Sequence, residues 1–307
     1  MTSALATVPG AAVDQPPNDL ASRRPRLLMP LAVVLPPAGA VLILLALHHA
    51  AGLAEPDHAQ FALFWAGYLC GMLPLVALAC STGINGVTRA CALTGIGLFG
   101  TVGRALRIPA GPLGNDEFIH MRQALETYLH GDVGHVSQLL PISQDFPGLH
   151  QTISAFARLT GLPLWPAALA VIFLAHVLSV LAVYQLVRAV GASASGAAAG
   201  AVVYTLNPSW ASFDVSVSYE SLALPLLLWG LAATVAASRG PKQPSLRYIA
   251  VVVLCAAALP MIHHLCGSKG RPPLSIGRCA VQMIDLGVEM RPRGDRESGW
   301  RRARARI

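Results

Sequence analysis

The chain has 307 residues, of which 54% are hydrophobic and 12% are charged, and its formal net charge is +7. Because a soluble domain usually carries about 25% charged residues, this composition and a mean hydropathy of +0.56 exclude an ordinary soluble enzyme and predict an integral membrane protein. Residues 267–307 hold ten Lys and Arg against four Asp and Glu, so most of the positive charge lies there. The apolar body is nearly neutral and offers no basic surface for nucleic acid.

The predicted architecture is an all-α, polytopic bundle of transmembrane helices. A membrane-crossing helix needs about 20 mainly apolar residues, and seven segments of the chain are suitable. They cover residues 27–51, 61–80, 84–102, 164–187, 192–206, 222–237 and 248–265. The third segment contains Arg89 and several glycines, and the fifth is short and rich in alanine, so the pattern is weakest in these two.

The first 26 residues are polar and include Arg23, Arg24 and Arg26 just before the first predicted span. That span is too long for the hydrophobic region of a cleavable signal, so we expect it to be retained after a disordered cytoplasmic leader, residues 1–26. Seven spans threaded from a cytoplasmic N-terminus place the short basic connections inside the cell. The predicted location is the plasma (inner) membrane, with multiple passes.

This threading gathers the polar connections at the extracytoplasmic face. The loop of residues 103–163, the turn of residues 207–220 and the end of the seventh span all emerge there. Ionisable groups near hydrocarbon are costly and tend to be kept where they bind or react. The candidate site residues at this face are Asp116, Glu117, His120, Asp145, His150, Asp214, Tyr219, Glu220, His263 and His264.

The most informative stretch is residues 114–120, where Asp116 and Glu117 are adjacent and His120 follows. Apolar residues recur at helical spacing over residues 116–130, which predicts an amphipathic helix on the membrane surface. Asp116 and His120, four residues apart, can converge on one ligand. A purely structural explanation is also open, because Asn115 is a suitable N-cap and the helix dipole favours acids in a first turn.

Two further connections are candidates for the same site. The Pro147-Gly148 dipeptide predicts a turn between Asp145 and a second surface helix over residues 149–159. The turn of residues 207–220 breaks the fifth span near the interface. Each of these connections could equally be an ordinary solvated turn.

The histidine pair at the end of the seventh span is the last candidate. Neighbouring residues on a helix point about 100° apart, so at most one of His263 and His264 faces a central cavity. The pair can equally have an interfacial structural role.

Glycine and cysteine patterns point to packing. Residues 95–100 match GxGxxG, but they lie inside an apolar span with no preceding strand, so we do not expect a cofactor role. Residues 67–71 and 196–200 each place two glycines four apart, which predicts close helix packing. The six cysteines form no CxxC pair, so we predict packing roles rather than a zinc site or a disulfide framework.

In their order and sidedness these features resemble the GT-C class of membrane glycosyltransferases, in particular its actinobacterial multispanning members. Those enzymes take sugars from polyprenyl-phosphate carriers at the outer face of the membrane. The resemblance covers residues 104–265 and rests on the Asp116-Glu117 pair, residues 146–149, residues 207–220 and the His263-His264 pair. Unlike many members, this chain has three predicted spans before the acidic loop.

The resemblance implies an inverting sugar transfer from a polyprenyl-phosphate donor to a cell-envelope glycan or protein acceptor. It assigns the general base to Asp116, with Glu117 as the second choice, and the other candidate residues to substrate binding. It also implies a divalent cation (Mg or Mn) held by Asp116 and Glu117 against the carrier phosphate. The implied partners are membrane lipid, the lipid-linked donor and the acceptor, and no nucleic acid.

The chain changes character after Leu265. Residues 266–307 contain no span, carry nine arginines and would lie outside, against the usual preference of basic residues for the cytoplasm. We expect either an out-of-frame product that truncates a longer glycosyltransferase, or a genuine disordered basic tail that binds anionic lipid or polymer. The predicted organisation is a leader (1–26), a transmembrane domain (27–265) with its external loop (103–163), and this tail.

Two functions therefore stay open. One is a glycosyltransferase, or an inactive fragment of one. The alternative is a non-catalytic membrane transporter or a partner protein of envelope biosynthesis, in which the acids and histidines bind ions or lipid-linked cargo. Paired inverted repeats would favour transport, and the sequence has no convincing internal repeat.

Overall fold

The computed structural model describes residues 19–51, 57–107, 111–131, 145–207, 215–239 and 245–262. All regular structure in these ranges is α-helical, which confirms the predicted fold class for the described part of the chain. The helices are α1 (Asp19–Ala50), α2 (His58–Cys80), α3 (Gly86–Arg107), α4 (Asn115–His130), α5 (Gly148–Thr160), α6 (Leu164–Ala189), α7 (Ala194–Leu206), α9 (Tyr219–Arg239) and α10 (Leu246–Ile262).

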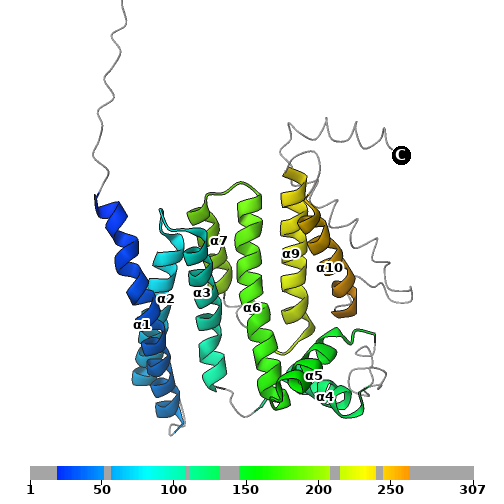
Figure 1. Ribbon diagram of the computed structural model, residues 1–307. Helices are drawn as coiled ribbons and strands as arrows, with labels where there is room; N and C mark the ends of the chain where they lie inside the picture. Colours follow the sequence, from blue (N-terminus) through cyan, green and yellow to red (C-terminus); the bar gives the residue numbers. More distant parts are fainter. Residues whose placement is uncertain are drawn as a thin grey trace, which may run out of the picture.

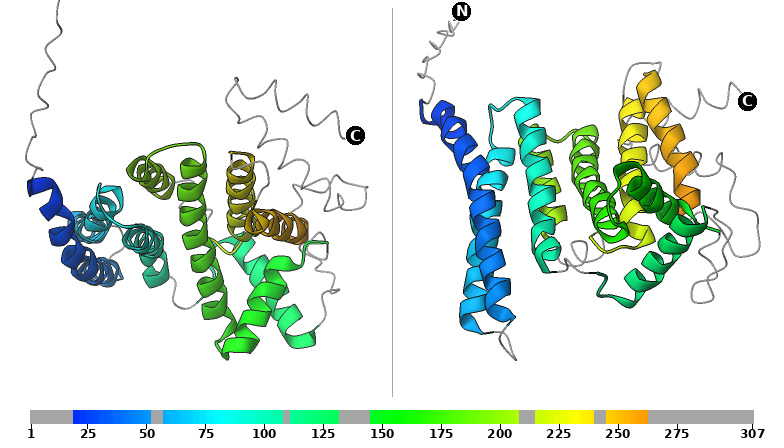
Figure 2. Two further views of the ribbon diagram at one scale, coloured as in Figure 1. Left: turned by 45° about the horizontal axis from the view of Figure 1, so that its top comes forward. Right: turned by 60° about the horizontal axis from the view of Figure 1, so that its bottom comes forward.

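Seven of these helices stand side by side, and α4 and α5 lie across one end of them (Figure 1). Helix α6 occupies the middle, where it contacts α3, α7, α9 and α5. The α1–α2 pair and the α9–α10 pair lie on opposite sides of it in all three views (Figure 2). The helices alternate in direction, so α3, α7 and α10 end, and α6 and α9 begin, at the end of the bundle that carries α4 and α5.

Within the described ranges, four helices are long and apolar enough to cross a membrane: residues Leu27–Ala50 of α1, α2, α6 and α9. Helices α7 and α10 are apolar but have 13 and 17 residues. At about 1.5 Å per residue they fall short of a hydrocarbon layer of about 30 Å. Helix α3 has 22 residues but is less apolar. The predicted count of about seven spans, the sidedness of each end and the placement of α4 and α5 on the membrane surface stay predictions.

The predicted N-terminal boundary differs from the structure, and the predicted C-terminal boundary lies outside the described residues. Helix α1 begins at Asp19, inside the segment predicted as a disordered leader. Residues 1–18 and the predicted tail, residues 266–307, lie outside the described residues.

Arg89, the charged residue inside the third predicted span, is 3% exposed. Its guanidinium donates hydrogen bonds to the carbonyl oxygen of Ala79 and, at 2.9 Å, to that of Ser81. These carbonyls belong to the end of α2, where a helix lacks its own donors and where its dipole favours a cation. Arg89 therefore caps α2 from α3, which explains how a charge is accommodated in this segment.

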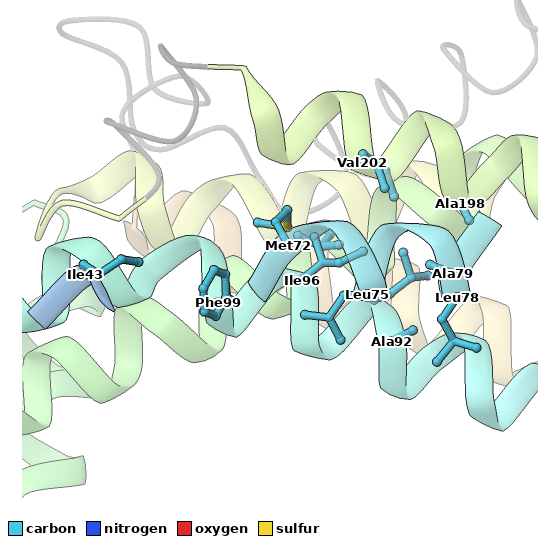
Figure 3. Packing of buried hydrophobic residues seen from close by; sticks show 13 residues of the cluster. Ile43, Met72, Leu75, Leu78, Ala79, Ala92, Ile96, Phe99, Ala198 and Val202 are labelled. Atoms are coloured by element: carbon cyan, nitrogen blue, oxygen red, sulfur yellow. The ribbon is translucent and has the colours of Figure 1, made fainter. Parts of the chain in front are cut away.

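The largest hydrophobic cluster joins α1, α2 and α3 to α6 and α7. Ile43, Met72, Ile96 and Phe99 are among its buried members, and Figure 3 shows them with Ala198 and Val202 of α7 beside α2. Small residues allow the helices to approach closely here. A Cβ atom built on Gly71 would lie 2.1 Å from Cζ of Phe99. The predicted packing role of the glycines in residues 67–71 is therefore confirmed.

Gly39→Ala should separate α1 from α2. A Cβ at Gly39 would lie 2.4 Å from the carbonyl oxygen of Gly67 and 2.9 Å from the backbone nitrogen of Gly71, and backbone atoms cannot rotate away. We expect a loss of about 1–3 kcal/mol in the free energy of unfolding, measured by titration from mild detergent into SDS. Gly86→Ala is the control, because its Cβ would meet nothing within 4 Å. Equal stability of the two variants would contradict the close approach.

Candidate functional site

The site is built around the first turn of α4. Gly114 is the N-cap of this helix, rather than the predicted Asn115, and Glu117 reaches back over the helix start. Its Oε2 atom accepts hydrogen bonds from the backbone N–H groups of Leu113 at 3.2 Å and Gly114 at 3.4 Å. This arrangement supplies an acceptor to N–H groups that precede the first helical turn.

The Oε1 atom of Glu117 connects α4 to two other parts of the chain. It accepts from the guanidinium of Arg104, near the end of α3, and from the backbone N–H of Val217 at 2.9 Å, just before α9. Glu117 is 4% exposed. Burial alone would raise the pKa of Glu117, but the hydrogen bonds from Val217, Leu113 and Gly114 and the charge of Arg104 together lower it. Glu117 is therefore an ionised anchor with both oxygens occupied.

Two buried histidines meet between α4 and α5. Nδ1 of His120 lies 3.1 Å from Nε2 of His150, and the rings stack with centroids 5.4 Å apart. Tyr219, the first residue of α9, packs edge-on against both rings, at 4.5 Å from His120 and 5.6 Å from His150. Three predicted site residues from separate helices thus form one cluster.

Packing between α4 and α5 holds the histidine pair in place. Ser154 of α5 donates a hydrogen bond to the carbonyl oxygen of Ala124 at 2.8 Å. Arg158 donates to the carbonyl oxygen of Tyr128 and lies over its ring, 5.3 Å from the centroid. Leu149 and Ile153 belong to the hydrophobic cluster that joins these two helices to α6. The two short helices form one unit docked on the end of α6.

Burial keeps both histidines neutral. It lowers the pKa of His150 to about 3, with a further contribution from His120. It also lowers the pKa of His120, although the charges of Glu220 and Asp116 act in the opposite direction. At neutral pH the cluster therefore offers hydrogen bonds rather than positive charge.

The hydrogen bonds favour one tautomer. Nδ1 of His150 is buried and has no hydrogen-bond partner among the described residues. A buried N–H without a partner is rarer than a buried acceptor without one, so we assign the His150 proton to Nε2, which donates to Nδ1 of His120. His120 then carries its own proton on Nε2.

Three exposed carboxylates surround this cluster. Asp116, Glu220 and Asp145 are all exposed to solvent. Asp116 and Glu220 are close enough to His120, and Asp145 is close enough to Tyr219, for their charges to interact. The arrangement combines exposed acidic side chains with buried, neutral, hydrogen-bonding rings.

The implied divalent cation does not fit the described donor set. Among the described residues no group of three or more His, Cys, Asp and Glu side chains is arranged to hold a metal ion. The two residues that the resemblance assigns to the cation diverge: Glu117 is turned into its ion pair with Arg104, and Asp116 faces solvent. The divalent cation stays a prediction of the resemblance.

The structure brings together seven of the ten predicted site residues: Asp116, Glu117, His120, Asp145, His150, Tyr219 and Glu220. The other three, Asp214, His263 and His264, lie outside the described residues. Sequence reasoning missed Arg104 and the Val217 N–H group. Arg104 had one signal in the sequence, because it lies in the same predicted loop, residues 103–163, as the Asp116-Glu117 pair.

Acid should loosen the docked α4–α5 unit. The pKa values of His120 and His150 are lowered in the fold, so unfolded or undocked histidines bind protons first as the pH falls below about 6.5. Stability is therefore complete above that pH and is lost as the pH falls toward the folded pKa of His150, about 3. Between pH 6.5 and 5 we expect the free energy that holds the α4–α5 unit in its docked state to fall by about 1–2 kcal/mol. The reason is that each additional proton bound by the undocked state contributes about 1.4 kcal/mol per pH unit.

Hydrogen exchange of amides in residues 117–131 and 148–160, corrected for the intrinsic pH dependence, measures this effect. Helix α7 is the internal control, because it carries no group that titrates in this range. His150→Asn should flatten the response. Equal pH dependence in α5 and α7 would contradict the assignment of neutral buried histidines.

No family model, no curated protein and no solved structure matches this chain.

Proposed function

We propose that this chain is a membrane glycosyltransferase, or a segment of one, that uses a polyprenyl-phosphate sugar as donor. The observation that carries the proposal is the position of Asp116. It is an exposed carboxylate at the start of α4 whose charge, like that of Glu220, acts on the neutral His120 ring. It lies at the end of the bundle where α3, α7 and α10 end and where α6 and α9 begin.

The proposed reaction needs one ionised base at this end. Asp116 removes the proton of an acceptor hydroxyl while the hydroxyl oxygen attacks the anomeric carbon of the donor sugar. The bond from that carbon to the carrier phosphate breaks, and polyprenyl phosphate leaves with the bonding electrons, so configuration inverts. Asp116 suits this role better than Glu117, because both oxygens of Glu117 are already held by Arg104 and by backbone donors.

The histidine pair has a positioning role in this proposal. A neutral His120 ring with its proton on Nε2 donates one hydrogen bond to a sugar or acceptor oxygen, and its Nδ1 is held by His150. Because Tyr219 packs against both rings, the direction of that donor is fixed. Fixed donors need no reorganisation during the reaction, which is how preorganised polar groups assist catalysis.

The test is a reconstitution of the full chain in lipid nanodiscs and in sealed vesicles. A polyprenyl-phosphate hexose labelled in the sugar serves as donor and a short envelope glycan as acceptor. Label on the acceptor together with released polyprenyl phosphate supports transfer. In sealed vesicles, intact donor that changes leaflet without bond cleavage would instead support the transporter alternative. A preparation that does neither would refute both activities for this chain and leave a partner role.

A further inference from the structure

A cavity lies at the end of the bundle opposite the candidate site. Its volume is about 540 Å³, and it is formed by the C-terminal part of α6, the C-terminal half of α9 and the start of α10. Its lining includes Gln185, Arg188, Trp229, Ala233, Arg247 and Tyr248. None of these residues takes part in the proposed sugar transfer.

The charge of this cavity is entirely positive. Arg188 comes from α6 and Arg247 from α10, and the described residues that line the cavity include no Asp or Glu. The neighbouring described segments, residues 185–207, 232–239 and 245–262, contain no acid either. Two guanidinium groups on separate helices, without a described carboxylate beside them, are suited to an anion from outside the chain.

Both arginines are oriented but keep donors available. Arg188 donates one N–H to the carbonyl oxygen of Ala192 at 2.5 Å. Arg247 lies over the ring of Tyr248, 4.8 Å from the centroid, with a nitrogen 3.2 Å from the hydroxyl oxygen. A guanidinium has five N–H donors, so each retains several for a ligand. A planar donor set of this kind matches phosphate oxygens.

The floor of the cavity is apolar and aromatic. Ala232, Ala233 and Ala236 of α9 contribute small side chains, and Trp229 lies beside them. The indole N–H of Trp229 donates to the carbonyl oxygen of Leu178 at 3.1 Å, which fixes the ring between α9 and α6. Free phosphate would gain nothing from such a floor, whereas a lipid can place its phosphate at the arginines and its glycerol and acyl atoms along the alanines.

We propose that this cavity binds the phosphate headgroup of an anionic phospholipid from the leaflet on the basic side of the bundle. A juxtamembrane basic side chain gains affinity from the negative surface of such a leaflet. The inference is independent of the proposed transfer reaction, because the cavity and Asp116 lie at opposite ends of the bundle. Its test therefore measures binding alone.

The experiment titrates the delipidated full chain in a non-ionic detergent and counts bound lipid by native mass spectrometry. The ligands are phosphatidylglycerol, phosphatidylcholine and glycerol 3-phosphate. We expect saturable binding of phosphatidylglycerol with a Kd at least tenfold below that of phosphatidylcholine. Arg188→Gln combined with Arg247→Gln should raise the Kd for phosphatidylglycerol at least tenfold. Arg122→Gln removes one charge from an exposed position on α4 and should leave that Kd unchanged.

A cavity-filling variant keeps the test decisive if the double variant does not fold. Ala236→Leu retains both arginines but occupies part of the floor, and it should weaken phosphatidylglycerol binding too. Equal affinity for the two phospholipids, or unchanged affinity in both cavity variants, would overturn the proposal. Binding of glycerol 3-phosphate as tight as that of phosphatidylglycerol would identify a soluble phosphate as the ligand and overturn the lipid assignment.

Discussion

If the proposed sugar transfer takes place, Asp116→Asn should lower its rate by about 10²–10⁴-fold, the usual contribution of a general base. Asparagine has nearly the same shape as aspartate but cannot accept the acceptor proton. Because Asp116 is exposed, the change costs little folding free energy, and substitutions at such positions stay within about 0.5 kcal/mol. Initial transfer rates in nanodiscs, measured beside donor binding, test the expectation. Donor binding should be largely retained.

Two variants make this result specific to Asp116. Glu126→Gln makes the same change of charge on the same helix, where Glu126 pairs with Arg122 on the surface, and it should transfer sugar at the wild-type rate. Glu220→Gln tests the other exposed acid close to His120. Full activity of Asp116→Asn would remove Asp116 from the mechanism. Loss of activity only in Glu220→Gln would move the base to Glu220.

Glu117→Gln weakens the attachment of α4 to the bundle by about 2–3 kcal/mol. Breaking a fully buried ion pair costs about 3–5 kcal/mol, and the partial exposure of Arg104, at 20%, reduces that figure. Glutamine retains one acceptor for the Val217 N–H, but its amide N–H₂ faces the N–H groups of Leu113 and Gly114. We expect faster hydrogen exchange in residues 111–131 and 215–218, with smaller changes in α1 and α2.

Glu126→Gln again provides the matched control. Its ion pair with Arg122 spans one turn of α4 at the surface, and such pairs contribute about 0.3–0.5 kcal/mol. A Glu117→Gln and Arg104→Gln double variant should be less destabilised than the sum of the single variants, because each single change leaves a buried partner behind. Equal hydrogen-exchange rates in the Glu117→Gln and Glu126→Gln variants would contradict the anchoring role of Glu117.

Local sequence patterns predicted the positions of the described helices. A helix is present at each of the seven predicted apolar segments and at both predicted surface positions. The glycines of residues 67–71 were assigned to packing from spacing alone, and they lie where α2 meets α1 and α3. These successes share a cause: apolar periodicity and small-residue spacing depend only on neighbours within a few turns.

The helix boundaries depended on contacts that such patterns do not include. Asn115 has the composition of an N-cap, yet Gly114 takes that position because the Glu117 side chain supplies the acceptor for the N–H groups before the helix. Arg89 weakened the membrane-span pattern of the third segment, yet it is buried as a cap on a different helix. The role of a residue that contacts another helix cannot be predicted from the pattern of its own segment.

The sequence by itself determined that the described part of the chain is all-helical with apolar segments of membrane-spanning character, and that acids and histidines gather in the polar connections. Only the tertiary structure decided which acid is anchored and which is exposed. Asp116 and Glu117 are neighbours on one helix, so their side chains point about 100° apart. Because α4 docks with the Glu117 side facing the bundle, Glu117 contacts Arg104 and Val217, whereas Asp116 is exposed to solvent. The same docking brings His120 to His150, because pairing across 30 residues requires two helices to pack.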